Sequence, residues 1–258
     1  MTTIAVAAAK SSPGTSTLAE LVAVLAPPGC RPMLVDADPS GGDWLLRPGI
    51  ASEPGLASLA MAARRGLPPG ELAAHLQHVG DGLGVLVAPA AARQATAALE
   101  LVADALAGEL AGLDAVIDAG TLAESSPALP LVRAADLVVL VARPTARAVV
   151  HLAPWVEQLG ADGLAVAVAL APLERRRRTE PAYRPAEVAD ALGVEVLGAL
   201  PDDPEGTERL WAQPGRRSAV ASTRLARAAA ALSAAAFARA ASSPLGAPAA
   251  PVTSEVVS

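Results

Sequence analysis

Lys10 is the single lysine among the 20 lysine and arginine residues of the chain, and it opens a loop of small residues that runs to Thr17. An apolar run at 4–8 precedes this loop, and the apolar pattern of a helix follows it at 18–25. A strand, loop and helix start of this kind direct free backbone N–H groups and the positive end of the helix dipole toward one point. The loop therefore predicts a phosphate site; the alternative is an ordinary turn whose Ser or Thr caps the helix.

Three aspartates follow two other strand-like runs. Asp36 and Asp38 come after the run at 32–35, and Asp118 comes after the run at 115–117. Ligands of parallel sheets gather beyond the carboxyl ends of the strands, so these carboxylates are expected near the predicted phosphate loop, where Mg²⁺ would bridge them to a nucleotide. We expect the fold to gather one ammonium and three carboxylates there. The alternative for the first two aspartates is turn chemistry in an Asp-Pro and Gly-Gly stretch.

The elements that must position these residues alternate between short β-branched or Leu-rich runs and longer Ala- and Leu-rich helical stretches. This alternation predicts an α/β fold with a doubly wound, mostly parallel sheet and helices on both faces, in three layers. Strands are predicted at 4–8, 32–35, 83–87, 115–117, 137–142, 164–170 and 194–197. Helices are predicted at 17–25, 55–65, 69–77, 92–111, 127–134, 146–159, 185–192 and 218–241.

Composition indicates one domain over residues 1–241, followed by a Ser-, Pro- and Ala-rich tail at 242–258 that is expected to be disordered. The net charge of −6 disfavours a whole-surface role in gripping nucleic acid. Cys30 is the single cysteine, so a disulfide framework is excluded, which fits a reducing cytoplasm. The N-terminus lacks a secretory leader, and the apolar runs fall short of the roughly 20 residues that cross a bilayer. We expect a cytoplasmic protein, with peripheral contact to the inner face of the membrane left open.

In order and spacing, these segments resemble the MinD/ParA branch of P-loop ATPases. The deviant Walker A loop of that family reads Lys-Gly-Gly-x-Gly-Lys-Thr-Thr, its second strand ends in Asp-x-Asp, and its fourth ends in Asp. The run at 197–204, Leu-Gly-Ala-Leu-Pro-Asp-Asp-Pro, is similar to the family's late strand and its Ile-Pro-x-Asp loop beside the adenine. The resemblance covers most of the chain and implies the P-loop NTPase fold, with ATP and Mg²⁺ as ligands.

The resemblance implies a role for each matching position. Lys10 matches the signature lysine, which in this family reaches the phosphates of the partner subunit in an ATP-sandwiched dimer, and Asp38 matches the residue that orients the attacking water. Ser16, Asp36 and Asp118 match the groups around Mg²⁺. The implied nucleotide contacts are Lys10, Ser12, Gly14, Thr15, Ser16, Thr17, Pro201 and Asp203.

The loop also departs from the family pattern. Thr15 stands where the Walker lysine belongs, and losing a charge-assisted contact with phosphate costs roughly 1.5 to 3 kcal/mol. Pro13 removes one N–H donor besides, and the strand at 164–170 ends without the asparagine that the family often uses to read adenine. Loops with Thr, Ser or Ala at this position resemble the CpaE/TadZ subgroup, which is associated with placing type IV pilus machinery and tolerates weak or absent hydrolysis.

We therefore expect a nucleotide-binding positional or scaffolding protein that serves placement at a cell pole, septum, chromosome or pilus machinery. It is expected to form a homodimer through its nucleotide face, to bind a protein partner, and to act at most as a slow ATPase. Two alternatives stay open. One is a pseudo-ATPase that binds partners without nucleotide, and the other is an ATP-dependent metabolic enzyme on the same fold, which would need an intact Walker lysine.

Two further groups of residues were weighed for ligand binding. Arg175 to Arg178 form a basic run that would suit DNA phosphates or anionic lipid, with a plain solvated loop as the alternative. His75 and His78 would share one helix face at the i, i+3 spacing. They are interpreted as surface residues, since no cysteine or acidic trio completes a metal site.

Overall fold

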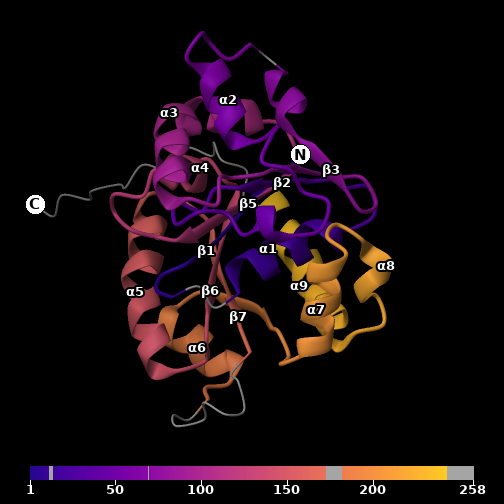
Figure 1. Ribbon diagram of the computed structural model, residues 1–258. Coiled ribbons are helices and arrows are strands. Elements are labelled where there is room, and N and C mark those ends of the chain that lie inside the picture. The colour runs from indigo at the N-terminus through magenta and orange to yellow at the C-terminus, as the bar shows by residue number, and fades with distance from the viewer. Residues whose placement is uncertain (12–13, 69, 173–181, 243–258) are drawn as a thin grey trace, which may run out of the picture.

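One eight-stranded sheet forms the centre of the chain in the computed structural model, which describes residues 1–11, 14–68, 70–172 and 182–242. The strand order is β3-β4-β2-β5-β1-β6-β7-β8, and every neighbouring pair is parallel except β3 with β4 (Figure 1). The strands are β1 Thr3–Ala8, β2 Met33–Asp36, β3 Gln77–Val79, β4 Leu83–Leu86, β5 Ala115–Thr121, β6 Leu137–Ala142, β7 Val166–Leu170 and β8 Glu195–Ala199.

Helices cover both faces of the sheet, which gives the three layers expected from the sequence (Figure 1). One apolar cluster joins the sheet to α2 Leu56–Ala63, η2 Glu71–His75, α3 Ala92–Leu110, α4 Leu129–Arg133, α5 Ala146–Ala161 and α6 Pro185–Leu192. The other joins the opposite face to α1 Thr15–Val24, η1 Trp44–Leu46, α7 Pro204–Ala212, α8 Arg217–Val220 and α9 Arg224–Ala241. The fold is therefore the predicted doubly wound α/β architecture.

The central strands are apolar because both of their faces are covered. Every residue of β1 and β6 is buried, and alternate side chains enter the two clusters. Val, Leu and Ala make up most of this interior, as the low aromatic content requires. The carboxyl ends of these parallel strands lie along one edge of the sheet. The strands therefore fix the positions of the polar residues at that edge.

The seven predicted strands are present, β6 with the predicted ends and the others with shifted ends, but the helix predicted at 69–77 is wrong. Its region forms the short 3₁₀ helix η2 and then the edge strand β3, which pairs antiparallel with β4. Gly80 and Gly82 have φ of 53° and 95°, and this left-handed backbone lets the chain reverse between the two strands. His75 and His78 consequently do not share a helix face. The His75 Nδ1 is 2.7 Å from Ser58 Oγ, and His78 lies exposed on β3.

The C-terminal region also differs from its prediction. Helix α7 was not predicted, and the helix expected at 218–241 is split into α8 and α9. The break is stabilised by Thr223, whose hydroxyl accepts a hydrogen bond of 3.0 Å from the Ala226 N–H and so caps α9.

Some expectations fall on parts of the chain that the structure leaves out. The run Arg175 to Arg178, Ser12 and, apart from Ser242, the tail at 242–258 lie outside the described residues. Within the described ranges, none of the helices has both the length and the apolar character needed to cross a membrane.

A buried ion pair between Glu20 and Arg47 connects α1 to the segment after β2, and Glu20 also contacts the segment after α7. Arg47 Nη1 donates a hydrogen bond to Glu20 Oε2, and the Gly215 N–H donates to Glu20 Oε1 at 3.1 Å. The Arg47 guanidinium lies between two aromatic rings, 4.2 Å from the centroid of Trp44 and 4.7 Å from that of Trp211. Burial raises the pKa of the Glu20 carboxyl, and the charge of Arg47 offsets part of that rise. The pair thus fastens α1, the segment after β2 and α7 to one another.

Breaking this pair should destabilise the protein strongly. Arg47→Ala is expected to lower the free energy of unfolding by about 3 to 5 kcal/mol, because it leaves the Glu20 carboxylate unpaired in the interior. Urea denaturation at pH 7 measures the loss. Arg209→Ala is the matched control, since its ion pair with Glu205 is largely exposed and should contribute less than about 1 kcal/mol. Equal losses in the two variants would contradict a special role for the buried pair.

Candidate nucleotide-binding site

The N-terminus of α1 is open at the carboxyl end of β1. Gly14 precedes the helix with φ of 92°, in the left-handed conformation that glycine favours, and the helix has no side-chain cap. Thr15 is fully buried in the first turn, and its Oγ1 makes no hydrogen bond to any described residue. The first-turn N–H groups and the helix dipole therefore point to a site that attracts an anion.

Asp36 and Asp118 lie side by side at the ends of β2 and β5, where the two strands pair in register. Each is 1% exposed. The Ala88 N–H donates to Asp36 Oδ2 at 3.4 Å, and the Gly120 N–H donates to Asp118 Oδ1 at 3.2 Å. Asp118 Oδ2 is buried with no hydrogen bond to the described part of the chain. Sheet pairing, which brings together residues 82 positions apart in sequence, thus builds the carboxylate pair predicted from the strand ends.

Two glycines make room for the carboxylates. A Cβ on Gly42 would overlap the carboxylate of Asp36, and a Cβ on Gly120 would overlap that of Asp38. Asp38 therefore lies close to Gly120 of β5, and its Oδ1 accepts a hydrogen bond of 2.8 Å from the Ser40 N–H. All three predicted aspartates gather in one place, as expected.

Burial and mutual repulsion disfavour the charged forms of the pair. Desolvation raises the pKa of Asp36 well above its ordinary value, and the charges of Asp118 and Asp38 add to the rise. Desolvation also raises the pKa of Asp118 to about 6; the Ser16 hydroxyl lowers it, while Asp38 raises it. None of the groups that shift these two pKa values is a lysine or an arginine.

These residues fit a magnesium ion bound together with phosphates. Mg²⁺ uses one or two carboxylates, waters and phosphate oxygens instead of a cage made of protein side chains. The described residues accordingly contain no group of three or more His, Cys, Asp or Glu arranged for a metal. Asp118 Oδ2, which accepts no hydrogen bond from the described residues, and the Ser16 hydroxyl, which interacts with the same carboxylate, are suitable donors, and a cation there would offset the repulsion between Asp36 and Asp118.

A cavity of about 570 Å³ adjoins the start of α1. Gly14 and Thr17 lie at one end, and Pro201 and Trp211 line the wall formed by the loop after β8 and by α7. Its size and its mixed polar and apolar lining suit a nucleoside.

Asp203 also lines the cavity, but both of its oxygens are already in use. Oδ1 accepts from the Gly206 N–H at 3.2 Å, and Oδ2 accepts from the Leu225 N–H at 3.0 Å. The bond from Leu225 is the largest cause that lowers the pKa of this carboxyl. Asp203 therefore caps α7 and ties it to the start of α9, so it holds the cavity wall in place.

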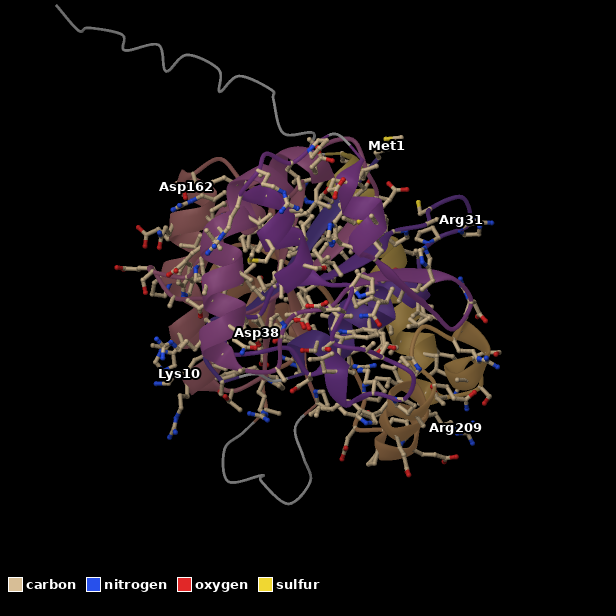
Figure 2. All side chains as sticks on the ribbon, turned by 45° about the horizontal axis from the view of Figure 1, so that its top comes forward. Met1, Lys10, Arg31, Asp38, Asp162 and Arg209 are labelled. Atoms are coloured by element: carbon tan, nitrogen blue, oxygen red, sulfur yellow. The ribbon has the colours of Figure 1, made fainter. Side chains whose placement is uncertain are left out.

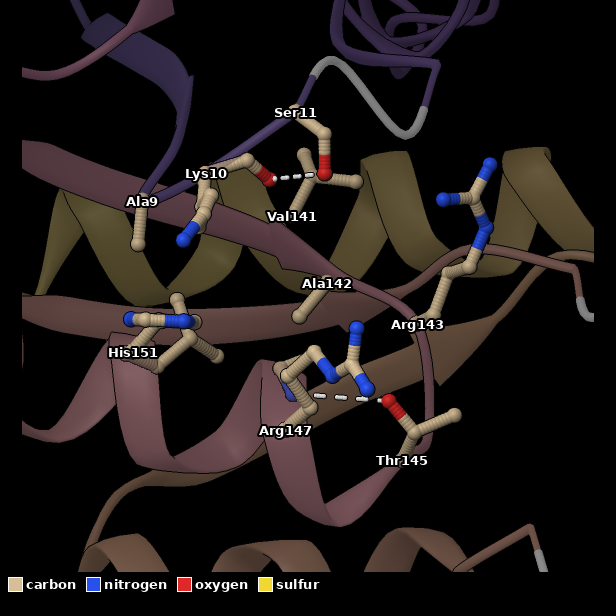
Figure 3. Close-up of a pocket in the computed structure, with 11 residues that line it drawn as sticks. Ala9, Lys10, Ser11, Val141, Ala142, Arg143, Thr145, Arg147 and His151 are labelled. Atoms are coloured by element: carbon tan, nitrogen blue, oxygen red, sulfur yellow. Dashed lines mark hydrogen bonds between the residues drawn. The ribbon is translucent and has the colours of Figure 1, made fainter. Parts of the chain in front are cut away.

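Lys10 is not among the groups that shift the pKa values of Asp36 and Asp118, so its expected place beside these carboxylates stays a prediction. Lys10 is exposed, and it lines a separate cavity of about 220 Å³ with Arg147, His151 and other residues of α5. Figure 2 places Lys10 near the edge of the molecule, and Figure 3 shows its ammonium directed toward His151. Lys10 thus leaves the end of β1 on the side that faces α5.

Three residues of this region are not predicted from the sequence as part of the site or its frame: Arg143, Trp211 and Arg47. Arg143 follows β6 directly and lines both cavities. The rule that polar residues at strand ends gather near ligands would have found it. No sequence signal indicates that Trp211, part of the unpredicted helix α7, would stack on Arg47.

Comparison with known proteins identifies the fold. No family model and no curated protein matches this sequence. Among solved structures, a ParA family ATPase from Chlorobium tepidum TLS aligns with a TM-score of 0.71 and 18% identity over 90% of this chain and 98% of its own. The septum site-determining protein MinD from Pyrococcus horikoshii OT3, complexed with Mg-ADP, aligns with a TM-score of 0.71 and 19% identity over 90% and 94%. In the MinC:MinD complex of Aquifex aeolicus the values are 0.61 and 16% over 90% and 94%. At these identities the likeness is one of architecture, and the chain has the fold of the MinD/ParA-type P-loop NTPases.

Proposed function

We propose that this chain is a nucleotide-binding positioning or scaffolding protein of MinD/ParA type, which dimerises through its nucleotide face and hydrolyses ATP slowly or not at all. The observation that carries the proposal is the buried Asp36 and Asp118 pair beside the uncapped start of α1. Burying two neighbouring carboxylates is costly without a cation, so the arrangement is more typical of a site than of a structural core. The solved structures with this fold include MinD with Mg-ADP and MinD with MinC, which supports a nucleotide ligand and a protein partner.

Each residue at the edge of the sheet has a definite task in this proposal. The first-turn N–H groups of α1 bind the phosphates, and Ser16, Asp36 and Asp118 hold the metal ion. Mg²⁺, when bound, supplies the positive charge that the phosphates require. Asp38 sits beside the pair with its Oδ1 fixed by Ser40, where it would orient a water molecule.

Slow or absent turnover follows from Thr15. A neutral hydroxyl replaces the ammonium that would stabilise charge building up on the transferred phosphoryl group. This substitution is the reason for proposing the CpaE/TadZ-like branch, whose members place pilus machinery. Cell-pole, septum or chromosome placement remain the related possibilities within the same class of positioning protein.

Lys10 is suited to act on a second copy of the chain. It is exposed at the same edge of the sheet and is not engaged with the carboxylates of its own subunit. An ammonium in this position is available to phosphates bound by a partner subunit, as the signature lysine of the family would be. The proposed dimer therefore forms through the nucleotide face.

A pseudo-ATPase that binds its partners without nucleotide is the second candidate. It is favoured by the neutral Thr15 at the centre of the phosphate loop and by the separation of Lys10 from the carboxylates. The two candidates differ in whether ATP binds at all.

Calorimetric titration of the full chain with ATP separates these candidates. We expect binding that depends on Mg²⁺ and weakens roughly tenfold to hundredfold in Asp118→Asn, because one charged contact to the metal is lost. Phosphate release is measured in parallel; any rate above background should vanish in Asp38→Ala. Absence of ATP binding at every magnesium concentration would favour the pseudo-ATPase.

The dimer interface is tested through Lys10. Lys10→Ala should leave the ATP affinity of the monomer within about twofold of the parent, because the side chain lies outside its own site, yet reduce the ATP-dependent dimer. Light scattering after size exclusion, with and without MgATP, measures the dimer. Arg227→Ala on the exposed side of α9 is the control and should dimerise as the parent does. A normal dimer in Lys10→Ala would exclude this role.

The carboxylate pair should also appear in the pH dependence of stability. The Asp118 pKa is near 6 in the folded chain and about 3.9 when unfolded, so the folded state binds more protons between these values and loses stability as pH rises through them. Asp118→Asn should therefore be more stable than the parent at pH 8, by about 1 to 3 kcal/mol, and nearly equal to it at pH 4. Urea denaturation at both pH values tests this. Asp190→Asn, at an exposed carboxylate on α6, should show no such difference.

A further inference from the structure

Arg143 occupies the boundary between the two cavities at the edge of the sheet. It follows the last residue of β6 and precedes Pro144, and it is half-buried. It lines the cavity of about 570 Å³ together with Gly14 and Thr17 of the phosphate loop and its helix. Figure 3 shows its guanidinium extending away from α5, on which Arg147 lies. The side chain thus belongs to the wall of the larger cavity next to the start of α1.

The charges around that cavity are unevenly distributed. Arg143 is the only cation among the described residues that line it, and the other charged lining residues are Asp202, Asp203 and Glu208 on the α7 side. Its guanidinium makes no hydrogen bond or ion pair to any residue in the described part of the chain. Phosphates would be repelled by the acidic side and attracted to the end where Arg143 and the helix start lie. A ligand carrying both a base and phosphates is therefore oriented with its phosphates toward Arg143.

We propose that Arg143 supplies the positive charge for phosphate binding that a Walker lysine would provide, since Thr15 stands at the position of that lysine. The proposal rests on the nucleotide-binding function and names a residue that the family resemblance does not assign. A guanidinium suits this task because it remains charged at all relevant pH values and offers two parallel N–H donors to phosphate oxygens. Arg143 would reach the phosphates from the end of β6, whereas a Walker lysine would reach them from the phosphate loop itself. A residue after a neighbouring strand of the same subunit thus replaces the charge that the loop lacks.

The alternative is that Arg143 acts together with Lys10 and binds an anion in the smaller cavity. Arg143, Arg147 and His151 line that cavity together, so all three would then contribute to one anionic contact. The two readings predict different behaviour of Arg147, which lines only the smaller cavity. This difference provides a matched control of the same residue type.

The test measures the affinity of the full chain for MgATP by calorimetry at fixed ionic strength. Arg143→Ala and Arg143→Gln should each weaken ATP binding by about tenfold to a hundredfold, the range for losing a charge-assisted contact. Arg147→Ala should change the affinity by less than about threefold, since that residue does not line the larger cavity. Adding Thr15→Lys to Arg143→Ala should restore most of the lost affinity, because the new ammonium returns a charge to the same phosphates. Circular dichroism and thermal melting establish that each variant folds.

The possible results separate the role of Arg143 from the proposed nucleotide-binding function. Unchanged affinity in both Arg143 variants, with the parent binding ATP, would overturn this inference and leave the proposed function intact. Equal losses in the Arg143 and Arg147 variants would also overturn it in favour of the smaller cavity. Absence of ATP binding by the parent would overturn the proposed function, and the role of Arg143 with it. Loss on Arg143 substitution with recovery by Thr15→Lys would establish the compensation, because a merely structural defect would not be repaired by a lysine in the loop.

Discussion

The arrangement at the edge of the sheet depends on one electrostatic constraint, namely that two carboxylates are buried next to each other. Asp36 and Asp118 are brought together by the pairing of β2 with β5, and each is almost completely removed from water. Their repulsion and desolvation oppose folding, so the rest of the fold must tolerate that cost. Gly42 leaves space for the Asp36 carboxylate, backbone N–H groups provide partial compensation, and the uncapped start of α1 leaves the neighbouring space to an anion. Each of these features fits the proposed metal and phosphate ligands.

A second polar group is buried for a different reason. Glu20 and Arg47 neutralise one another, and the guanidinium is further enclosed by Trp44 and Trp211. This pair holds α1, the segment after β2 and α7 in fixed relation, and residues of α1 and α7 line the larger cavity. The paired charges of Glu20 and Arg47 stabilise the arrangement of these elements. The carboxylates of Asp36 and Asp118 have no such counter-charge among the described residues, and they mark the place where a ligand is expected.

The sequence predicted the architecture well because the strands are buried on both faces and therefore appear as uninterrupted apolar runs. It predicted the meeting of Asp36, Asp38 and Asp118 for a related reason, since residues at the carboxyl ends of parallel strands must share an edge. It failed at β3, where a short edge strand after a 3₁₀ helix has no apolar periodicity to distinguish it. It did not indicate that Lys10 would line a cavity with α5, because the direction of a loop side chain depends on contacts that are distant in sequence. Arg143 and the Trp211 contact with Arg47 were missed because they depend on the packing of separate elements.

Asp203 has a consequence for the mechanics of the molecule. A single carboxylate receives hydrogen bonds from the first turn of α7 and from the start of α9, so one side chain joins the wall of the larger cavity to the long C-terminal helix. Helix α9 also packs against α1 and β8, so a displacement of this helix would be felt at the wall of the larger cavity both through the Asp203 carboxylate and through direct packing. The position of the last described helix is therefore coupled to the shape of that cavity.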